Sequence, residues 1–173
     1  ILYVGRLQNG KRVNLLLNVW KKIHLEFPDW KMKIVGDGPD LLNTKLMIKE
    51  LNLNNITLVG HSSKVEEYYK KSSIFISLSA FEGFPMVLAE AVLYGVVPIV
   101  YNTFESVTDL IINEKTGYII NELDEYNLIN KLKNLMLDKI SRQNMAIKGN
   151  EMILKYDVNK VWNSWNSLLK GYY

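Results

Sequence analysis

Two glutamates separated by seven residues are the side chains best placed to do chemistry. Glu82 and Glu90 lie in the segment Ser79–Ala91, and Pro85 between them suits the first position of a helix. A helix that begins there presents free backbone N–H groups and the positive end of its dipole, which together attract an anion. Glu82 lies just before that start, where its carboxylate could accept hydrogen bonds from a neutral polyol.

The second glutamate lies among residues that are almost all apolar. A helix that is apolar on nearly every side is buried, so the pattern predicts a buried carboxylate at Glu90. A buried carboxylate without partners is strongly destabilising, which means that Glu90 needs hydrogen-bond donors. A pair of ribose hydroxyls would supply them. The alternative interpretation is that Glu90 faces solvent or pairs with a lysine.

The first glycine-containing loop, Gly5–Arg12, nearly matches the phosphate-binding pattern G-x-x-x-x-G-K-[ST]. It departs at Arg12, which replaces the hydroxyl residue that would hold Mg²⁺, and no apolar strand ending in a suitable aspartate follows. A nucleoside triphosphatase is therefore a distant alternative, and no metal ligand is assigned. Arg6 and Lys11 together predict a metal-free diphosphate site, because a guanidinium fork and an ammonium can neutralise neighbouring phosphates.

Two more loops of the same kind follow. Gly36 begins a Gly-Asp-Gly-Pro turn that opens a helix, and glycine there lets the backbone approach a ligand closely. The turn Val59–His61 offers a histidine that could touch a nucleotide base. Both sequences are also compatible with ordinary turns, and a lone histidine is not assigned a catalytic role.

Short apolar runs alternate with longer segments of helical periodicity along the chain, as in βα units around a parallel sheet. We expect one domain over residues 1–173, a Rossmann-like α/β fold with a doubly wound, mainly parallel six-stranded sheet and a helical C-terminal tail. Ligands in such sheets bind at the carboxyl ends of the strands. The predicted strands are Ile1–Val4, Met32–Val35, Ile56–Val59, Ile74–Leu78, Val97–Val100 and Gly117–Ile120. The predicted helices are Val13–Glu26, Leu41–Asn52, Val65–Lys71, Pro85–Tyr94, Ser106–Ile112, Asp124–Leu137, Ser141–Lys155 and Val158–Lys170.

Composition excludes several classes of protein. The 173 residues contain no cysteine, so neither a disulfide nor a thiolate site can form. No apolar run approaches the ~20 residues of a membrane span, and we expect a cytoplasmic protein. The net charge of +3 comes from alternating basic and acidic blocks rather than a continuous basic stripe, which argues against nucleic acid as a partner. The basic C-terminal segment leaves room for peripheral association with the inner face of a membrane.

The motifs fall in an order that resembles a known family. The E-x7-E block, G-R-L-x-x-x-K at residues 5–11, G-x-G-P at 36–39, V-G-H at 59–61 and T-G-Y at 116–118 are similar to those of the retaining GT-B glycosyltransferases of group 1, the GT4-like enzymes. The resemblance covers the whole chain and implies the C-terminal, donor-binding lobe. One departure is Arg12, which follows Lys11 where the family commonly has glycine.

The resemblance implies a role for each matching residue. Arg6 and Lys11, with Gly5 at the start of their loop, would bind the donor diphosphate. Glu82 would hold the donor sugar and Glu90 the ribose hydroxyls. Three further groups of residues would complete the site. The backbone at the helix start would help to hold the sugar, the next two residues would lie beside the phosphate and ribose, and two turns would lie near the nucleoside. In that order they are Gly83, Phe84, Pro85 and Met86; Val87 and Leu88; and Gly36 with Val59, Gly60 and His61.

The function implied is transfer of a sugar from a UDP- or GDP-linked donor to an acceptor, with retention of configuration and without a metal or a separate cofactor. Because the chain opens directly on a predicted strand at Ile1, we expect an N-terminal acceptor domain to be absent and the fragment to be inactive alone. Two alternatives stay open: a donor-binding subunit that pairs with a separate, membrane-bound acceptor subunit, and half of a nucleotide-sugar epimerase. The lysine- and asparagine-rich composition suggests a bacterial enzyme of surface polysaccharide synthesis, by association only.

The last predicted helix carries an apolar stripe. Val158, Val161, Trp162, Trp165 and Leu169 recur at helical spacing. We expect the tryptophans to pack in the core of this domain. A second hypothesis is that part of the stripe contacts the absent half, as the last helix does in the family, and burial of both rings within this domain would count against it.

Overall fold

A computed structural model describes residues 1–170, apart from the side chain of Val158. Its strands are each three to five residues long, and their mainly apolar, β-branched sequences suit strands that helices cover on both faces. Their bounds are β1 Leu2–Val4, β2 Met32–Val35, β3 Ile56–Gly60, β4 Ile74–Ser77, β5 Val97–Tyr101 and β6 Tyr118–Ile120.

These strands form one six-stranded sheet in the order β3-β2-β1-β4-β5-β6, and every neighbouring pair is parallel. This is the strand order of a Rossmann fold, so the predicted fold class is confirmed. The chain winds outward from β1 in one direction and returns to begin again at β4. The loops after β1 and β4 therefore leave the sheet side by side, at the point where the direction of winding reverses.

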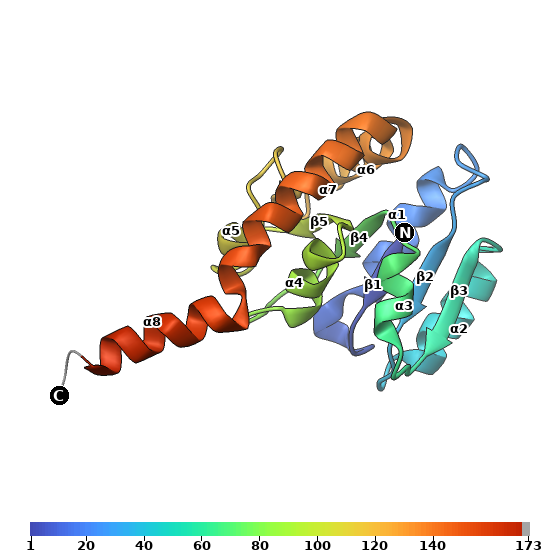
Figure 1. Cartoon of the computed structure of the whole chain (residues 1–173). Helices are drawn as coiled ribbons and strands as arrows, with labels where there is room; N and C mark the ends of the chain where they lie inside the picture. Colours follow the sequence, from blue (N-terminus) through green and yellow to red (C-terminus); the bar gives the residue numbers. More distant parts are fainter. Residues whose placement is uncertain (171–173) are drawn as a thin grey trace.

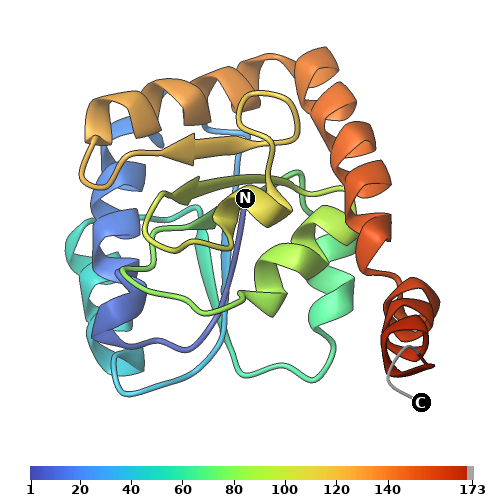
Figure 2. The ribbon, with the colours of Figure 1, turned by 90° about the vertical axis from the view of Figure 1, so that its left-hand side faces the viewer.

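Helices cover both faces of the sheet (Figures 1 and 2). Those of one face, α1, α2 and α6, pack around Trp20 and Leu132, whereas α3, α4 and α5 pack around Tyr69 and Leu88 on the other. Helix α7 contacts both α4 and α6. The helices are α1 Val13–Ile23, α2 Leu41–Glu50, α3 Val65–Lys70, α4 Met86–Leu93, α5 Val107–Leu110, α6 Glu125–Leu137, α7 Lys139–Ile153 and α8 Val158–Lys170, with short 3₁₀ turns at Asn9–Lys11 and Leu154–Tyr156.

The described helices end close to where the sequence predicts. Helices α1, α2, α4 and α5 are two or three residues shorter than predicted, and α7 begins and ends two residues earlier. The larger difference concerns α8, which extends away from the rest of the domain (Figure 1). Trp162 and Trp165 are 64% and 60% exposed, so the expectation that they pack in the core of this domain is wrong. The helices α1 to α7 already cover both faces of the sheet without α8.

Within residues 1–170, no helix is both long enough and apolar enough to cross a membrane.

Candidate functional site

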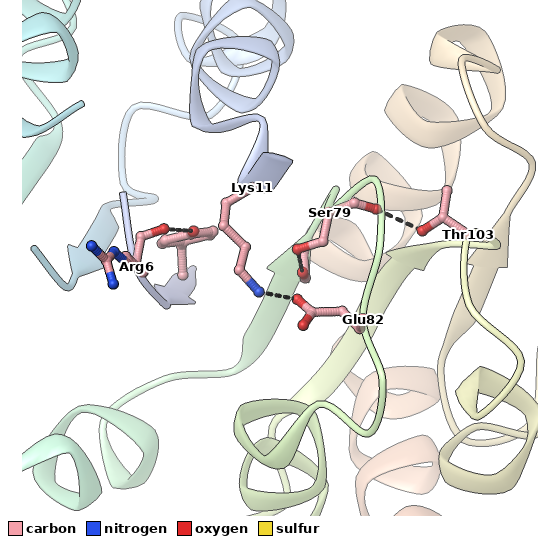
Figure 3. Close-up of polar contacts among 7 residues, drawn as sticks. Arg6, Lys11, Ser79, Glu82 and Thr103 are labelled. Carbon is pink, nitrogen blue, oxygen red and sulfur yellow. Dashed lines mark hydrogen bonds and ion pairs between the residues drawn. The ribbon is translucent and has the colours of Figure 1, made fainter. Parts of the chain in front are cut away.

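The loops after β1 and β4 meet where the winding of the sheet reverses. The backbone N–H of Ala80 donates to the carbonyl of Gly10 at 2.8 Å, which joins the two loops directly. Beside this bond, the ammonium of Lys11 forms an ion pair with the carboxylate of Glu82 (Figure 3). The two side chains are only 20% and 15% exposed, so the pair is largely shielded from solvent. The structure thus brings together two of the predicted site residues, from segments 71 positions apart.

Side chains from the loop after β5 hold the backbone that carries Glu82. The hydroxyl of Thr103 donates to the carbonyl of Ser79 at 2.6 Å, and the hydroxyls of Ser77 and Ser79 lie 3.2 Å apart (Figure 3). Three residues after Thr103 a similar bond follows, since the hydroxyl of Ser106 donates to the carbonyl of Gly83 at 2.6 Å. Each bond replaces a backbone partner that an irregular loop lacks. Sequence reasoning missed these supports, because their partners lie after a different strand.

The loop after β1 is supported from beneath. The hydroxyl of Tyr3 donates to the carbonyl of Arg6 at 3.3 Å. Burial raises the pKa of Tyr3, and the charge of Glu82 raises it further, so the hydroxyl stays protonated and remains a donor at neutral pH. Tyr3 therefore supports Arg6 and lies near Glu82. Its role cannot be recognised from the sequence, because Tyr3 looks there like any other buried strand residue.

A hollow of about 290 Å³ opens at the carboxyl ends of β1, β2 and β3. Three predicted site residues, Arg6, Gly36 and His61, are among the residues that line it. Figure 3 shows the side chain of Arg6 extending away from Lys11, so the two cations of the loop serve different parts of this edge. The hollow and the ion pair are thus neighbours that share one loop. The lining residues are Val4, Gly5, Arg6, Val35, Gly36, Asp37, His61, Ser62 and Val65.

Gly36 makes the close packing of these loops possible. Its φ of +146° lies in a region that other residues rarely adopt, and a Cβ added there would lie 1.8 Å from the carbonyl oxygen of Gly5. Its own N–H donates to the carbonyl of Gly60 at 2.8 Å. The sequence predicted a close approach of the backbone to a ligand at Gly36, and the structure shows the approach to be to the neighbouring loop.

Helix α4 begins one residue later than predicted, because Pro85 stands at the position before the first helical residue. Its carbonyl accepts from the N–H groups of Leu88 and Ala89, at 2.9 and 3.2 Å. The N–H groups of the first two helical residues, Met86 and Val87, have no acceptor one turn back within the helix and are available to an anion. This helix start lies directly after the loop that carries Glu82.

Glu90 lies one turn further along α4 and is half-buried rather than fully buried. The hydroxyl of Tyr69, on α3, lies 3.0 Å from Oε2 of Glu90 and 3.0 Å from the carbonyl oxygen of Val87. Burial raises the pKa of Tyr69, and the carboxylate of Glu90 raises it further, so the hydroxyl keeps its proton. A donor for this carboxylate therefore exists within the protein, where the sequence had suggested only ribose hydroxyls, solvent or a lysine.

The other predicted site residues differ in how far solvent, and therefore a ligand, can reach them. Gly83, Phe84 and Met86 are exposed at the loop and helix start, where a ligand could reach them. The side chain of Leu88 is instead buried in the core, so only its backbone could lie beside a ligand. Val59 is half-buried in β3, below the turn that carries His61.

Arg12 adopts a backbone conformation that explains why glycine is expected at its position. With φ 52° and ψ 39° it is left-handed, which glycine adopts without strain. Its guanidinium pairs with Glu122 at 2.5 Å, across the loop after β6. The turn after Lys11 thus keeps the shape that glycine would give it.

A parallel sheet in this order, with two loops joined where its winding reverses, defines a Rossmann-like domain, the class that binds nucleotides at this edge. The chain belongs to the glycosyl transferases group 1 family, whose model matches residues 1–152. It has the fold of one lobe of a GT-B glycosyltransferase.

Known proteins similar to the chain agree with this assignment. It is 30% identical over 170 residues to the amylovoran biosynthesis glycosyltransferase AmsD of Erwinia amylovora, covering 98% of the chain and 47% of AmsD. An uncharacterised glycosyltransferase of Haemophilus influenzae is 29% identical over 170 residues, covering 98% of the chain and 48% of that protein. The crystal structure of Anabaena HepE with UDP superposes with a TM-score of 0.89 at 17% identity, covering 98% of the chain and 48% of HepE. The chain thus spans about half the length of these relatives.

Proposed function

We propose that this chain is the donor-binding lobe of a glycosyltransferase and that it holds a nucleoside diphosphate sugar at the carboxyl edge of its sheet. The observation that carries the proposal is the meeting of Lys11 and Glu82 from two different loops, beside the hollow lined by Arg6. A cation and a carboxylate at one point suit a ligand that carries both an anionic diphosphate and neutral sugar hydroxyls.

The chemistry that these groups support is stabilisation of the leaving group. As the bond between the sugar and the phosphate breaks, negative charge grows on the diphosphate. Arg6, Lys11 and the start of α4 offer fixed positive charge and N–H donors to that charge. Glu82 would orient the sugar, and its carboxylate would favour positive charge on the ring. Retention of configuration and independence of a metal belong to the same proposal.

The relatives favour particular partners for the proposed enzyme. HepE was crystallised with UDP, which makes UDP the first nucleotide to test, with GDP as the second. AmsD is named for the biosynthesis of amylovoran, which supports a role in polysaccharide synthesis. Because relatives are about twice as long, we further propose that an acceptor-binding lobe completes the enzyme and that this lobe alone does not turn over. A cytoplasmic location, at the inner face of a membrane, suits an enzyme of this kind.

A panel of nucleotides tests the proposal directly. The melting temperature of the chain is measured with UDP, GDP, their sugar conjugates and Mg²⁺-ATP, because a ligand that binds only the folded state stabilises it in proportion to RT ln(1 + [L]/Kd). We expect stabilisation by a nucleoside diphosphate in the absence of metal. No shift with any nucleoside diphosphate or nucleotide sugar would contradict the proposed function.

Two substitutions then test the site assignment. Lys11→Ala removes a cation and leaves the carboxylate of Glu82 near the diphosphate without its partner, and Glu90→Ala removes the proposed ribose contact. Each should weaken binding of the diphosphate by ~1.5–3 kcal/mol, measured by titration calorimetry. Lys148→Ala on the exposed part of α7 serves as the control, with wild-type affinity expected. Wild-type affinity in both site variants would show that the nucleotide binds elsewhere.

A further inference from the structure

Tyr69 holds the carboxylate of Glu90 in one place. Its hydroxyl lies 3.0 Å from Oε2 of Glu90, and its ring stacks on that of Tyr94 with centroids 5.6 Å apart and planes 6° apart. Tyr69 is 1% exposed. A ring that is both buried and stacked cannot swing away, so the position of its hydroxyl is fixed by packing and not by the contact with Glu90 itself.

The hydroxyl has a single proton and faces two acceptors, Oε2 of Glu90 and the carbonyl of Val87. Both acceptors lie on α4, so the same group ties the first turn of that helix to α3. Within residues 1–170, the hydrogen bond that the structure places on this carboxylate is the one from Tyr69 to Oε2, so Oε1 can accept from a ligand. The carboxylate is half-buried, which leaves that second oxygen a path to a ligand.

Helix α3 connects this contact to the hollow. Val65 lines the hollow, and Tyr69 lies four residues later on the same face of the helix. Tyr69 therefore lies about one helical turn from the residue of α3 that lines the hollow, and its hydroxyl contacts Glu90 on α4. A nucleoside that enters the hollow would bring its ribose toward this pair.

We propose that Tyr69 is a positioning residue for the nucleotide: it holds Glu90 ready to accept the hydroxyls of the ribose. This inference rests on the proposed function, since it concerns how the same donor is bound. A free glutamate side chain loses conformational entropy when a ligand orders it. A carboxylate that Tyr69 already holds in place avoids most of that loss on binding. The hydroxyl of Tyr69 touches no substrate and acts only through Glu90.

The test uses Tyr69→Phe, which keeps the stacked ring and removes only the hydroxyl. Its affinity for UDP is compared with that of the wild-type chain by titration calorimetry, and the comparison is repeated with 2′,3′-dideoxy-UDP, which lacks both ribose hydroxyls. We expect the substitution to raise the Kd for UDP by about three- to tenfold, the effect of one hydrogen bond. With the dideoxy nucleotide the effect should vanish, because no ribose hydroxyl is left for Glu90 to bind.

Further variants separate positioning from general loosening of the fold. Tyr94→Phe removes a hydroxyl from the other ring of the stack and should bind UDP as the wild type does. In the Glu90→Ala background, Tyr69→Phe should have no further effect on UDP affinity. Glu90→Asp, whose shorter side chain moves the carboxylate away from Tyr69, should weaken UDP binding even if Tyr69→Phe fails to fold.

The outcomes distinguish this inference from the proposed function. If the wild type binds UDP and Tyr69→Phe and Glu90→Asp bind it equally well, the positioning role is wrong and the proposed function stands. If Tyr69→Phe weakens UDP and dideoxy-UDP by the same factor, the hydroxyl supports the fold and does not act on the ribose. If neither UDP nor GDP binds the wild type, both the function and the inference fail.

Discussion

At the scale of single residues, the ion pair between Lys11 and Glu82 couples the two loops that form the site. Both side chains are largely shielded, so removing one leaves the other poorly solvated. Lys11→Ala and Glu82→Ala should each destabilise the ligand-free chain, and the double variant should be more stable than the sum of the two losses predicts. A double-mutant cycle from urea unfolding should give a coupling energy of ~1–2 kcal/mol. Additive losses would mean that the pair does not form in solution.

Arg12 allows a second test, because its backbone strain and its side-chain contact act in opposite directions. Arg12→Gly relieves the left-handed backbone but loses the ion pair with Glu122, whereas Arg12→Ala keeps the strain and loses the pair. We expect the alanine variant to be less stable than the glycine variant by ~1 kcal/mol in the free energy of unfolding. Equal stability would show that residue 12 leaves the left-handed region when its side chain is shortened.

The sequence suggests candidate residues for this site, but it does not show the contacts between them. Glu82 and Glu90 can be identified because their spacing around Pro85 is local. Tyr69 cannot be identified from the sequence, because its contact with Glu90 depends on how α3 packs against α4. In the sequence, a buried tyrosine in an amphipathic helix looks like any core residue. The burial of Glu90 is overestimated from the sequence for the same reason, since an apolar helix does not show which of its residues lies at the edge of a neighbouring helix.

At the scale of elements, Gly36 shows how strand ends are held close enough to build one site. Gly36→Ala places a Cβ against the carbonyl oxygen of Gly5, so β1 and β2 must separate locally. We expect a loss of ~2–3 kcal/mol in the free energy of unfolding. Gly10→Ala is the matched control, because a Cβ at Gly10 meets nothing within 4 Å, and it should change stability by less than ~0.5 kcal/mol. Equal losses in the two variants would contradict the steric argument.

The strands and helices themselves follow closely from the sequence. Met32–Val35 is predicted as it is found, because a short apolar run between turn residues fits only a buried strand here. The ends of the helices are predicted less closely than the strands. The sequence predicts a helix over Val13–Glu26, but α1 ends at Ile23. The helical pattern continues past the point where the backbone turns, at His24. The strand order is not predicted from the sequence, because doubly wound sheets differ in the strand at which their winding reverses.

At the scale of the whole molecule, α8 is the part of the described chain that has no partner for its apolar side. Val161, Trp162 and Trp165 are exposed, as are Leu168 and Leu169, and they all belong to one helix that leaves the domain. An exposed stripe of this kind is typical of a surface that another protein segment covers. Since the relatives are about twice as long, we propose that their additional half supplies that segment.

This placement makes a prediction that the chain alone can test. Because both rings lie in solvent, the double variant Trp162→Ser/Trp165→Ser should change the free energy of unfolding of the chain by less than ~0.5 kcal/mol in urea. Trp20→Ala is the control: its buried ring lies in the core, and its loss should reduce stability by ~3–5 kcal/mol. A loss above ~1 kcal/mol in the double variant would show that α8 folds back onto this domain in solution. With the stripe covered within the chain, the additional half of the relatives would no longer be needed to explain it.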